Sequence, residues 1–504
     1  MILSDLLRGV TVTAMSDGAQ YTEVSGISTD SRTVRPGEAF VAIRGTHTDG
    51  AEHIPEALSK GAKVCIVTEA KSVPDGAKYV AVPDTRIACA HMWSSYYGSP
   101  GDRLRIIAVT GTCGKTTTSM ILHHILKYAG YRTGVIGTLR SLIGDGELVT
   151  DGESEVSGIP SAMTTPDPKY LYGTLRKMAD AGCDTVILEA SSHALAQHKL
   201  DPLRPYLALF TNLSPEHLDF HPTMEDYLRA KAHLFALSEK GIVNAADPAA
   251  KRIHDFAPDC GIEYVAPANA DMPDGISPTY TYSDVSTTES DTSFTFASPA
   301  SSARMTVPLP GGFTAANASL AASAAALLGV PADVIKKALG TTPPIDGRME
   351  IIHSGAFTVM RDFAHTPASF ASVLTAVRPT CRGKLICVFG CGGDRDRTKR
   401  APMGEIAAAL SDYTVITSDN SRTESPSGII ADILAGVHED KPHTVIPDRR
   451  EAIAYALSVA KEGDLVILLG KGHETYEIDR TGKHPFDERK IVRDILRQYR
   501  TITG

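Results

Sequence analysis

The sequence lacks the long apolar runs and the paired cysteines that mark membrane proteins and disulfide-rich secreted proteins. No run of 18 apolar residues occurs, and the most apolar stretch, residues 315–330, contains Asn317 and Ser319, which is typical of a buried helix. The 8 cysteines are scattered and form no CxxC pair, which excludes a disulfide framework and a CxxC zinc site. Asp5 and Arg8 interrupt the N-terminal apolar stretch, so we expect no secretory signal and place the protein in the reducing cytoplasm.

Positive charge is also scarce relative to negative charge. The chain has 50 Lys and Arg against 59 Asp and Glu, a net charge of −9, so we do not expect nucleic acid as a partner. Hydrophobic residues make up 42% and charged residues 22%, which is typical of a well-packed globular protein and excludes a disordered or collagen-like chain. At about 150 residues per domain, a chain of 504 residues favours three domains.

Short apolar runs alternate with helical patterns along most of the chain, which predicts an α/β protein with parallel sheets. Turn-rich joints at 97–102 and 343–348 divide it into domains 1–100, 101–344 and 345–504. Strands are expected at 39–45, 63–70, 78–84, 104–111, 184–190, 206–212, 240–247, 356–363, 383–390, 412–419, 443–448 and 464–470. The last domain has the pattern of a doubly wound, Rossmann-like fold. Residues 266–304 are rich in Ser, Thr, Pro and Asp and predict either short antiparallel strands or a loop.

A glycine-rich turn lies between the expected strand 104–111 and a helical pattern at 116–128. In that context backbone N–H groups and the helix N-terminus hold phosphate oxygens, so we expect ATP to bind here. Val109 stands where the usual GxxxxGK loop has its first glycine, and a purely structural turn is the alternative. Lys115 would contact the outer phosphates, and the Thr116 hydroxyl would bind Mg²⁺. The candidate nucleotide-binding residues of this loop are Gly111, Thr112, Cys113, Gly114, Lys115, Thr116 and Thr117.

Acidic and histidine residues follow the next two strands of the central domain. Glu189 ends the strand 184–190, where a carboxylate points at the phosphate site and could hold Mg²⁺; a buried Glu that caps a helix is the alternative. His217 and His221 follow the strand 206–212 and suggest either a zinc site or surface histidines. Lys231 lies on an amphipathic helix, and periodicity alone predicts a solvated side chain.

A series of segments, taken in their order and spacing along almost the whole chain, resembles the Mur ligase family. The segments are TDSRTVRPGEAFVAIRG (29–45), TGTCGKTTT (110–118), TTPDP (164–168), EASSHALAQH (189–198), TNLSPEHLDFH (211–221), AKAHLF (230–235), GRME (347–350), DFAHTP (362–367), GCGGDRDRTKR (390–400), SDNSR (418–422) and GKGHE (470–474). The resemblance implies an N-terminal uridine-nucleotide domain, a central P-loop ATPase domain with a parallel sheet, and a C-terminal Rossmann-like domain.

The same resemblance implies roles for individual residues. Lys231 would carry a carbamate formed from CO₂, and with Thr116, Glu189 and His217 it would hold Mg²⁺; Lys115, Lys231, His217 and Glu189 would be catalytic. Asn317, Arg348 and Asp362 would contact the nucleotide. Substrate contacts are expected from Ser31, Thr46, His47 and Thr48 to the uridine diphosphate, and from Thr164, Thr165, Ser191, Gln197 and Lys199 to the muramoyl-dipeptide. Lys199 replaces an expected arginine, so its charge remains without the bidentate fork.

The implied reaction is ligation of meso-2,6-diaminopimelate to UDP-N-acetylmuramoyl-L-alanyl-D-glutamate through an acyl phosphate, in peptidoglycan synthesis. Arg422 would bind the second carboxylate of diaminopimelate, which L-lysine lacks. Asp419, Asn420, Ser421, Gly470 and Glu474 would complete that pocket, and the charged run 394–400 would help to shape it. Ser421 stands where diaminopimelate-specific relatives carry proline, so L-lysine or another diamino acid stays an alternative.

Two other functions are compatible with parts of this pattern. A folylpolyglutamate-type ligase would share the central ATPase domain but not the TDSR segment, and a non-catalytic nucleotide-binding protein would not need the set of ionisable residues described above. For the ligase we expect small-molecule substrates, no nucleic-acid partner, no membrane insertion and a monomer.

Overall fold

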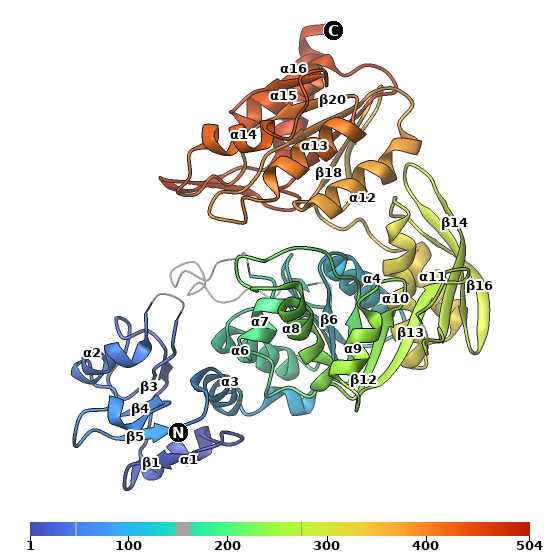
Figure 1. The fold of residues 1–504 in the computed structure, drawn as a ribbon. Coiled ribbons are helices and arrows are strands. Elements are labelled where there is room, and N and C mark those ends of the chain that lie inside the picture. The colour runs from blue at the N-terminus through green and yellow to red at the C-terminus, as the bar shows by residue number, and fades with distance from the viewer. Residues whose placement is uncertain (46–47, 145, 148–162, 274, 504) are drawn as a thin grey trace.

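The protein consists of three α/β bodies, each built around its own sheet (Figure 1). The structure is a computed structural model that describes residues 1–503 except 46–47, 145, 148–162 and 274. The three-domain α/β architecture expected from the sequence is confirmed, with one large sheet in each domain.

The N-terminal sheet has five strands, of which all but the first run parallel. In spatial order they are β1 (Ala14–Met15), β5 (Tyr79–Ala81), β4 (Val64–Val67), β3 (Ala39–Val41) and β2 (Ile27–Ser28). The helices of this domain are α1 (Leu3–Leu6), α2 (Ile54–Ser59) and α3 (Thr85–Tyr96). Asp84 caps α3 by accepting hydrogen bonds from the backbone N–H groups of Arg86 and Ile87.

The central sheet has 11 strands, and its inner part is parallel. In spatial order the strands are β16 (Ser301–Val307), β15 (Thr292–Ser298), β14 (Tyr280–Thr287), β13 (Gly261–Pro267), β12 (Lys240–Asn244), β11 (Leu207–Phe210), β6 (Arg105–Thr110), β10 (Thr185–Glu189), β7 (Thr133–Ile136), β8 (Ser141–Ile143) and β9 (Gly146–Glu147). The strands β14 to β7 pair in parallel, whereas β15 and β16 at one edge and β8 and β9 at the other are antiparallel. Of the segment 266–304, the part from residue 280 onward forms the strands β14, β15 and β16, with antiparallel pairing between them. The described residues between β13 and β14 form a loop, so each expectation holds for part of the segment.

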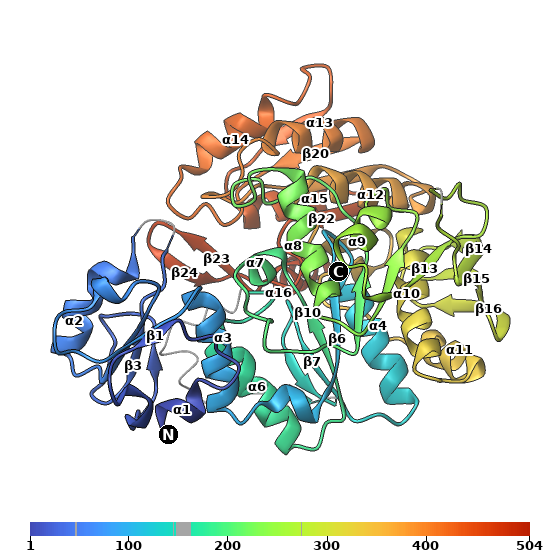
Figure 2. The same ribbon diagram turned by 60° about the horizontal axis from the view of Figure 1, so that its bottom comes forward.

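Helices cover both faces of the central sheet (Figures 1 and 2). Ile107 and Val109 of β6 pack with α4 (Lys115–Tyr128), α10 (Phe313–Leu327) and α11 (Ala332–Gly340). Ile106 and Ala108 point to the other face, in the direction of α6 (Pro168–Asp180), α7 (Ser192–Ala196), α8 (Met224–Ala236) and α9 (Ala250–Phe256). This second core also contains Trp93 of α3, so the N-terminal domain packs against α6. Among the described helices, α10 included, none has both the length and the apolar character needed to cross a membrane.

The C-terminal sheet has six strands and is parallel except at one edge, where the unpredicted strand β17 (Glu350–Ser354) runs antiparallel to β18. The remaining strands, in spatial order, are β18 (Thr358–Asp362), β22 (Leu465–Leu469), β19 (Leu385–Phe389), β20 (Tyr413–Ile416) and β21 (His443–Val445). One face packs with α12 (Pro367–Val377), α13 (Arg400–Leu410) and α14 (Pro426–Leu434), and the other with α15 (Arg449–Val459) and α16 (Glu488–Thr503). A hairpin of β23 (Tyr476–Asp479) and β24 (Gly482–Pro485), also unpredicted, stands apart from this sheet.

A fully buried ion pair joins α15 to α16 in the C-terminal domain. The Arg449 Nε donates to Glu488 Oε1 at 2.8 Å, and its Nη2 donates to the Leu469 carbonyl at 2.9 Å. Both side chains have an exposed fraction of 0%. Removing one partner of such a pair leaves the other charge buried without compensation, which costs far more than losing a surface ion pair.

Glu488→Ala is expected to lower the free energy of unfolding of the C-terminal domain by about 3–5 kcal/mol, because it leaves Arg449 buried without its counter-charge. Urea denaturation, monitored by far-UV circular dichroism, would measure the change. The exposed Glu462 provides the matched control: Glu462→Ala should change stability by less than about 0.5 kcal/mol. Equal effects of the two substitutions would contradict the prediction.

Candidate active site

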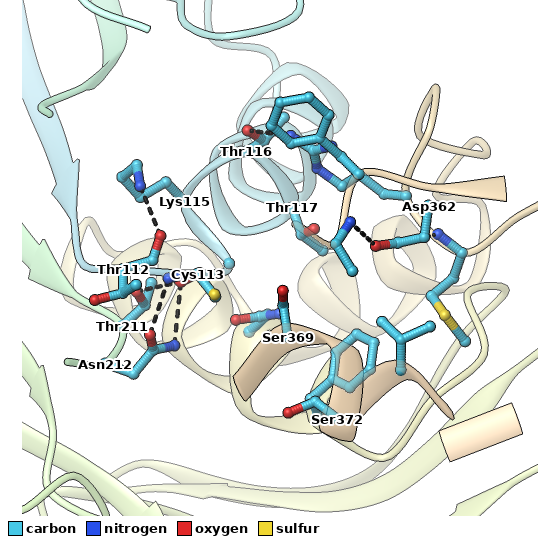
Figure 3. A pocket seen from close by; sticks show the side chains of 18 of the residues that line it. Thr112, Cys113, Lys115, Thr116, Thr117, Thr211, Asn212, Asp362, Ser369 and Ser372 are labelled. Carbon is cyan, nitrogen blue, oxygen red and sulfur yellow. Dashed lines mark hydrogen bonds between the residues drawn. The ribbon is translucent and has the colours of Figure 1, made fainter. Parts of the chain in front are cut away.

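A cleft of about 600 Å³ lies between the central and C-terminal domains. The phosphate loop forms one side, and the start of α12 with the end of β18 forms another. Figure 3 shows Asp362, Ser369 and Ser372 on the side away from Thr112 and Lys115. The predicted residues that line the cleft are Thr112, Cys113, Gly114, Lys115, Thr116, Thr117, Thr164, His217, Asn317, Arg348 and Asp362.

Two glycines give the phosphate loop its shape. Gly111 has φ 142°, and a Cβ added there would lie 1.9 Å from Thr211 Oγ1. Gly114 has φ 83° and packs against Asn317, whose Oδ1 would lie 2.5 Å from an added Cβ. A side chain is therefore excluded at both positions, and the loop turns directly into α4, whose first N–H groups are available to an anion.

The cationic residue of the loop, Lys115, is folded back onto the loop itself. Its Nζ donates to the carbonyls of Gly111 and Thr112 at 3.0 and 2.9 Å. Cys113 is fixed through its backbone, because its N–H donates to Asn212 Oδ1 at 2.9 Å. Burial raises the pKa of the Cys113 thiol to about 11, so the thiol is protonated and unreactive at neutral pH.

The carboxylate of Glu189 is buried and connects three loops. Its Oε2 accepts hydrogen bonds from Thr116 Oγ1 at 3.0 Å and from Thr138 Oγ1 at 2.9 Å. Its Oε1 accepts the backbone N–H of Thr138 at 3.1 Å, and its backbone carbonyl accepts Thr165 Oγ1 at 2.7 Å. Because β6, β7 and β10 are parallel neighbours, their carboxyl ends bring these residues to one edge of the sheet.

Lys231 lies beneath the phosphate loop and is not the solvated residue that periodicity predicted. Its Nζ donates to the Gly111 carbonyl at 2.7 Å and lies 4.2 Å from the centre of the Tyr227 ring. Only 1% of the residue is exposed. Burial, with a smaller contribution from the charge of Lys115, holds the pKa of Lys231 well below its usual range, so the neutral amine is favoured.

His217 lines the cleft on the other side of Tyr227, with 6.2 Å between the two ring centres. Burial lowers the pKa of His217 to about 4, so its imidazole is neutral and able to bind a metal ion. His221 lies apart from the cleft lining and its Nε2 is 3.0 Å from Ser192 Oγ. Both histidine rings lie against those of His193 and Tyr227. Among the described residues, however, neither belongs to a group of three His, Cys, Asp or Glu side chains with converging ligand atoms.

The donor set at this edge fits a magnesium ion. Thr116 Oγ1 and Glu189 Oε2 are 3.0 Å apart. Adjacent ligands in an octahedron with ~2.1 Å Mg–O bonds are separated by ~3 Å, so both oxygens could bind one ion. Oxygen ligands of this kind suit Mg²⁺, which also keeps several waters and substrate oxygens.

The C-terminal domain contributes Arg348 and the carboxylate that positions it. Arg348 Nη2 donates to Thr116 Oγ1 at 3.3 Å, and the guanidinium lies 4.7 Å from the centre of the Phe363 ring. Asp362 accepts the backbone N–H groups of Met349 and Ala364, both at 2.7 Å. Burial raises the pKa of Asp362, which the nearby Arg348 opposes.

The residues expected to contact the muramoyl-dipeptide lie next to Glu189. The hydroxyl groups of Thr164 and Thr138 form a hydrogen bond of 3.0 Å, and Thr165 Oγ1 donates to Ser191 Oγ at 3.2 Å. Lys199 follows α7, and its Nζ forms an ion pair with Asp167 at 2.7 Å. Gln197 is the C-terminal cap residue of α7.

Of the residues expected to contact the uridine diphosphate, Ser31 and Thr48 belong to the N-terminal domain and lie outside the cleft lining. Ser31 Oγ donates to Glu56 Oε2 at 2.6 Å, and the Thr48 carbonyl accepts the Gly45 N–H at 2.8 Å. Thr46 and His47 lie outside the described residues. Their proposed roles stay predictions.

A second group of predicted residues gathers at the carboxyl ends of β20 and β22. Asn420 Nδ2 donates to Glu474 Oε2 at 2.8 Å, and Asp419 Oδ2 would lie 2.7 Å from a Cβ added to Gly470, which has φ 108°. Arg422 Nη1 donates to the Gly393 carbonyl at 2.8 Å. Ser421 is buried in the same loop. The residues that the sequence singled out therefore lie close together at this sheet edge, and their roles in binding an amino acid stay predictions.

The charged run 394–400 is bonded to the loop that carries Arg422, although Asp394, Arg395, Arg397 and Thr398 are exposed to solvent. The Thr423 N–H donates to Asp394 Oδ2 at 3.1 Å. The positive charge of Arg395 adds to burial in lowering the pKa of Arg422. Arg400 is fully buried and forms ion pairs with Glu424 and Asp432.

Sequence reasoning missed several residues of both sites. Thr138 follows β7 at the same sheet edge as Glu189, so the strand-end rule that found Glu189 would also have found it. Lys471 is fully buried, and its Nζ donates to Asn420 Oδ1 at 3.0 Å. Glu216 and His365 form a 3.0 Å hydrogen bond between domains, for which no local pattern gives a signal.

Family comparisons cover most of the chain. The model described as "Mur ligase middle domain" matches residues 109–326, "Mur ligase, glutamate ligase domain" matches 347–472, and "Mur ligase family, catalytic domain" matches 23–97.

Two relatives that match almost the full length of the chain carry the same name. The UDP-N-acetylmuramoyl-L-alanyl-D-glutamate–2,6-diaminopimelate ligase of Gloeobacter violaceus is 42% identical, over 95% of each chain. The protein of the same name from Alkaliphilus metalliredigens is 37% identical, over 99% of this chain and 98% of its own. A solved structure of a ligase with this name superposes with a TM-score of 0.67 at 29% identity, covering 99% of both chains.

More distant structures share the fold alone. A MurF ligase from Thermotoga maritima in complex with ADP superposes with a TM-score of 0.61 at 18% identity, covering 96% of this chain and 99% of its own. A Mycobacterium tuberculosis folylpolyglutamate synthase superposes with a TM-score of 0.62 at 19% identity and covers 77% of this chain and 92% of its own.

Proposed function

The chain belongs to the Mur ligase family, and from that premise we propose that it joins meso-2,6-diaminopimelate to UDP-N-acetylmuramoyl-L-alanyl-D-glutamate with hydrolysis of ATP to ADP, a step of peptidoglycan synthesis. The observation that carries this proposal is the presence, in one chain, of a phosphate loop beside Glu189, His217 and Lys231 and a separate pocket with Arg422 and Glu474. A folylpolyglutamate-type ligase shares the fold but is less similar in sequence and covers less of the chain.

Amide synthesis in water requires an activated carboxylate, and the cleft is suited to making one. ATP would lie with its phosphates on the N-terminal end of α4, where Lys115 leaves the loop carbonyls to contact the outer phosphates. The γ-carboxylate of the D-Glu residue attacks the terminal phosphorus, the bond to ADP breaks, and an acyl phosphate forms. Arg348, which reaches Thr116 from the C-terminal domain, would stabilise the charge on the transferred group.

The residues that would hold Mg²⁺ are Thr116, Glu189, His217 and a carbamylated Lys231. When bound, the ion would neutralise phosphate charge and align the reacting oxygens. The buried amine of Lys231 fits the carbamate, because only a neutral amine reacts with CO₂ and burial keeps this pKa low. Carbamylation converts this neutral amine, with loss of a proton, into an anionic oxygen ligand, which Mg²⁺ accepts and an amine cannot supply.

The amine then attacks the acyl carbon, a tetrahedral intermediate forms, and phosphate leaves. The reacting amine must come from the pocket of the C-terminal domain, so that domain delivers the nucleophile to the central domain. Water must be excluded at this stage because it would hydrolyse the acyl phosphate. Contacts such as the one between Glu216 and His365 hold the two domains together beside the cleft.

Discrimination between diaminopimelate and L-lysine would rest on Arg422. Among the described residues only backbone carbonyls, those of Gly393 and Asn420, accept from its Nη1, which leaves the rest of the guanidinium for a carboxylate. The distal amino group would lie near Asp419 and Glu474, which supply negative charge at the other end of the pocket.

Release of phosphate by the full chain, with ATP, Mg²⁺ and UDP-muramoyl-dipeptide present, is expected to depend on a diamino acid. Diaminopimelate should give a kcat/KM about 10- to 150-fold higher than L-lysine, the range that corresponds to one charge-assisted hydrogen bond. A reaction without the muramoyl-dipeptide is the control. Absence of stimulation by any diamino acid would refute the ligase function.

Replacing the guanidinium of Arg422 should raise the KM for diaminopimelate but not the KM for L-lysine. Arg422→Ala is expected to raise the KM for diaminopimelate about 10- to 150-fold and to leave the weak reaction with L-lysine nearly unchanged. Arg422→Lys keeps the charge without the fork and should give an intermediate KM. An unchanged KM for diaminopimelate in both variants would show that the second carboxylate is recognised elsewhere.

The carbamate on Lys231 can be tested in solution. Activity should fall in CO₂-free buffer and return on addition of bicarbonate, and ¹³C-bicarbonate should give a carbamate signal in the ¹³C NMR spectrum of the protein. Lys231→Arg, which stays charged, should lose the signal and at least ~100-fold in kcat, because an essential metal ligand is missing. A fully active enzyme that gives no signal and ignores CO₂ would contradict the assignment.

A further inference from the structure

A second group of ligand-type side chains lies outside the cleft and has no part in the proposed reaction. Among the described residues, one set of at least three His, Cys, Asp or Glu side chains has all its ligand atoms within 4.8 Å of one another: His198, Asp201 and His233. His198 Nδ1 lies 2.8 Å from Asp201 Oδ2, and His233 Nε2 lies 2.9 Å from Asp201 Oδ1. One carboxylate is therefore placed between two imidazole nitrogens.

The group joins two elements that also carry residues of the candidate active site. His198 and Asp201 lie on the turn after α7, beside Lys199, and His233 lies in the last turn of α8. Lys231 is two positions before His233, and residues two apart on a helix point about 200° away from each other. The side chain of His233 thus leaves α8 on the side opposite to the phosphate loop, which Lys231 contacts.

The backbone of His198 adopts the left-handed conformation, which favours glycine. His198 has φ 57° and follows the cap residue of α7. Its N–H donates to the Leu195 carbonyl, and the Lys199 N–H donates to that of Ala194, both at 3.0 Å. This is the paired hydrogen-bond arrangement that ends many helices, usually with glycine at the left-handed residue. A histidine here accepts backbone strain, and its imidazole lies against Asp201.

We propose that His198, Asp201 and His233 bind a zinc ion, with two imidazole nitrogens and one carboxylate oxygen as ligands and water in the fourth position. Zn²⁺ prefers this donor set, and adjacent ligands in a tetrahedron with ~2.0–2.1 Å bonds are ~3.3 Å apart. The three ligand atoms already lie within 4.8 Å of one another, so small side-chain rotations would bring them to that spacing.

The site is also accessible to an ion and to the water that completes its coordination. The side chains of His198 and His233 are 32% and 30% exposed, while that of Asp201 is 14% exposed. The bound ion would cross-link the turn that carries Lys199 to α8. This inference does not depend on the proposed ligase function, because the three residues lie outside the cleft lining.

Metal binding by the full-length, metal-free protein tests the proposal. Zn²⁺ is titrated with excess Mg²⁺ present, bound zinc is measured by equilibrium dialysis, and Co²⁺ absorption reports the ligand type. We expect one equivalent of zinc per chain, a Co²⁺ spectrum without thiolate charge-transfer bands, and a melting temperature that rises with Zn²⁺.

Three variants locate the site. His198→Gly removes a ligand and relieves the backbone strain, so it should fold at least as well as the parent yet bind zinc at least ~10-fold more weakly; His233→Gln should weaken binding similarly. His254→Ala, at an exposed histidine of α9, is the matched control and should bind normally. His217→Ala should also still bind one equivalent of zinc, because His217 lines the cleft and is not part of the proposed zinc site.

The titration of the parent protein is the first test, and the variants are the second. If the parent binds no zinc under these conditions, the three residues form only a hydrogen-bonded network and the proposal is wrong. It is equally overturned if zinc binds but is lost in His217→Ala and retained in His198→Gly. Failure of the melting temperature to respond to Zn²⁺ in the parent would also count against it.

Discussion

A single buried carboxylate, that of Glu189, holds the parts of the active site in register. It accepts hydrogen bonds from Thr116 at the start of α4 and from Thr138 after β7, and its own backbone accepts one from Thr165. A carboxylate removed from water is stable only when its oxygens are bonded or paired, so these loops and this side chain stabilise one another. The phosphate loop and the loop expected to hold the dipeptide are thereby fixed relative to one strand end.

Positive charge is concentrated on the other side of that carboxylate. Lys115 and Arg348 approach the phosphate loop from different domains, and Lys231 lies below it. Three ammonium or guanidinium groups so close together repel one another, and the charge of Lys115 adds to burial in lowering the pKa of Lys231. Lys115 and Arg348 can therefore stay charged and face the phosphates of a nucleotide while the Lys231 amine stays neutral. CO₂ reacts only with a neutral amine.

The sequence predicted the fold well where physical signals are local. Apolar runs identified β6, β10 and β11, and the strand-end rule correctly brought the phosphate loop and Glu189 to one edge. Periodicity misplaced Lys231, since it reports the burial of a helix face but not the loop that covers it. The edge strand β17 and the hairpin β23–β24 were missed because short polar strands lack a distinctive pattern. The bond between Glu216 and His365 joins residues 149 positions apart, which no local window contains.

The division of labour between the two larger domains has an evolutionary consequence. The C-terminal domain has its own buried cores and carries the residues proposed to bind the amine in the segments 419–422 and 470–474, whereas its contribution to the cleft comes from 348–373. The parts that choose the nucleophile and the parts that complete the phosphate chemistry are thus separate stretches of one scaffold. Lineages can therefore change the cross-linking residue of their cell walls by altering a few loops, with the energy-consuming step left intact.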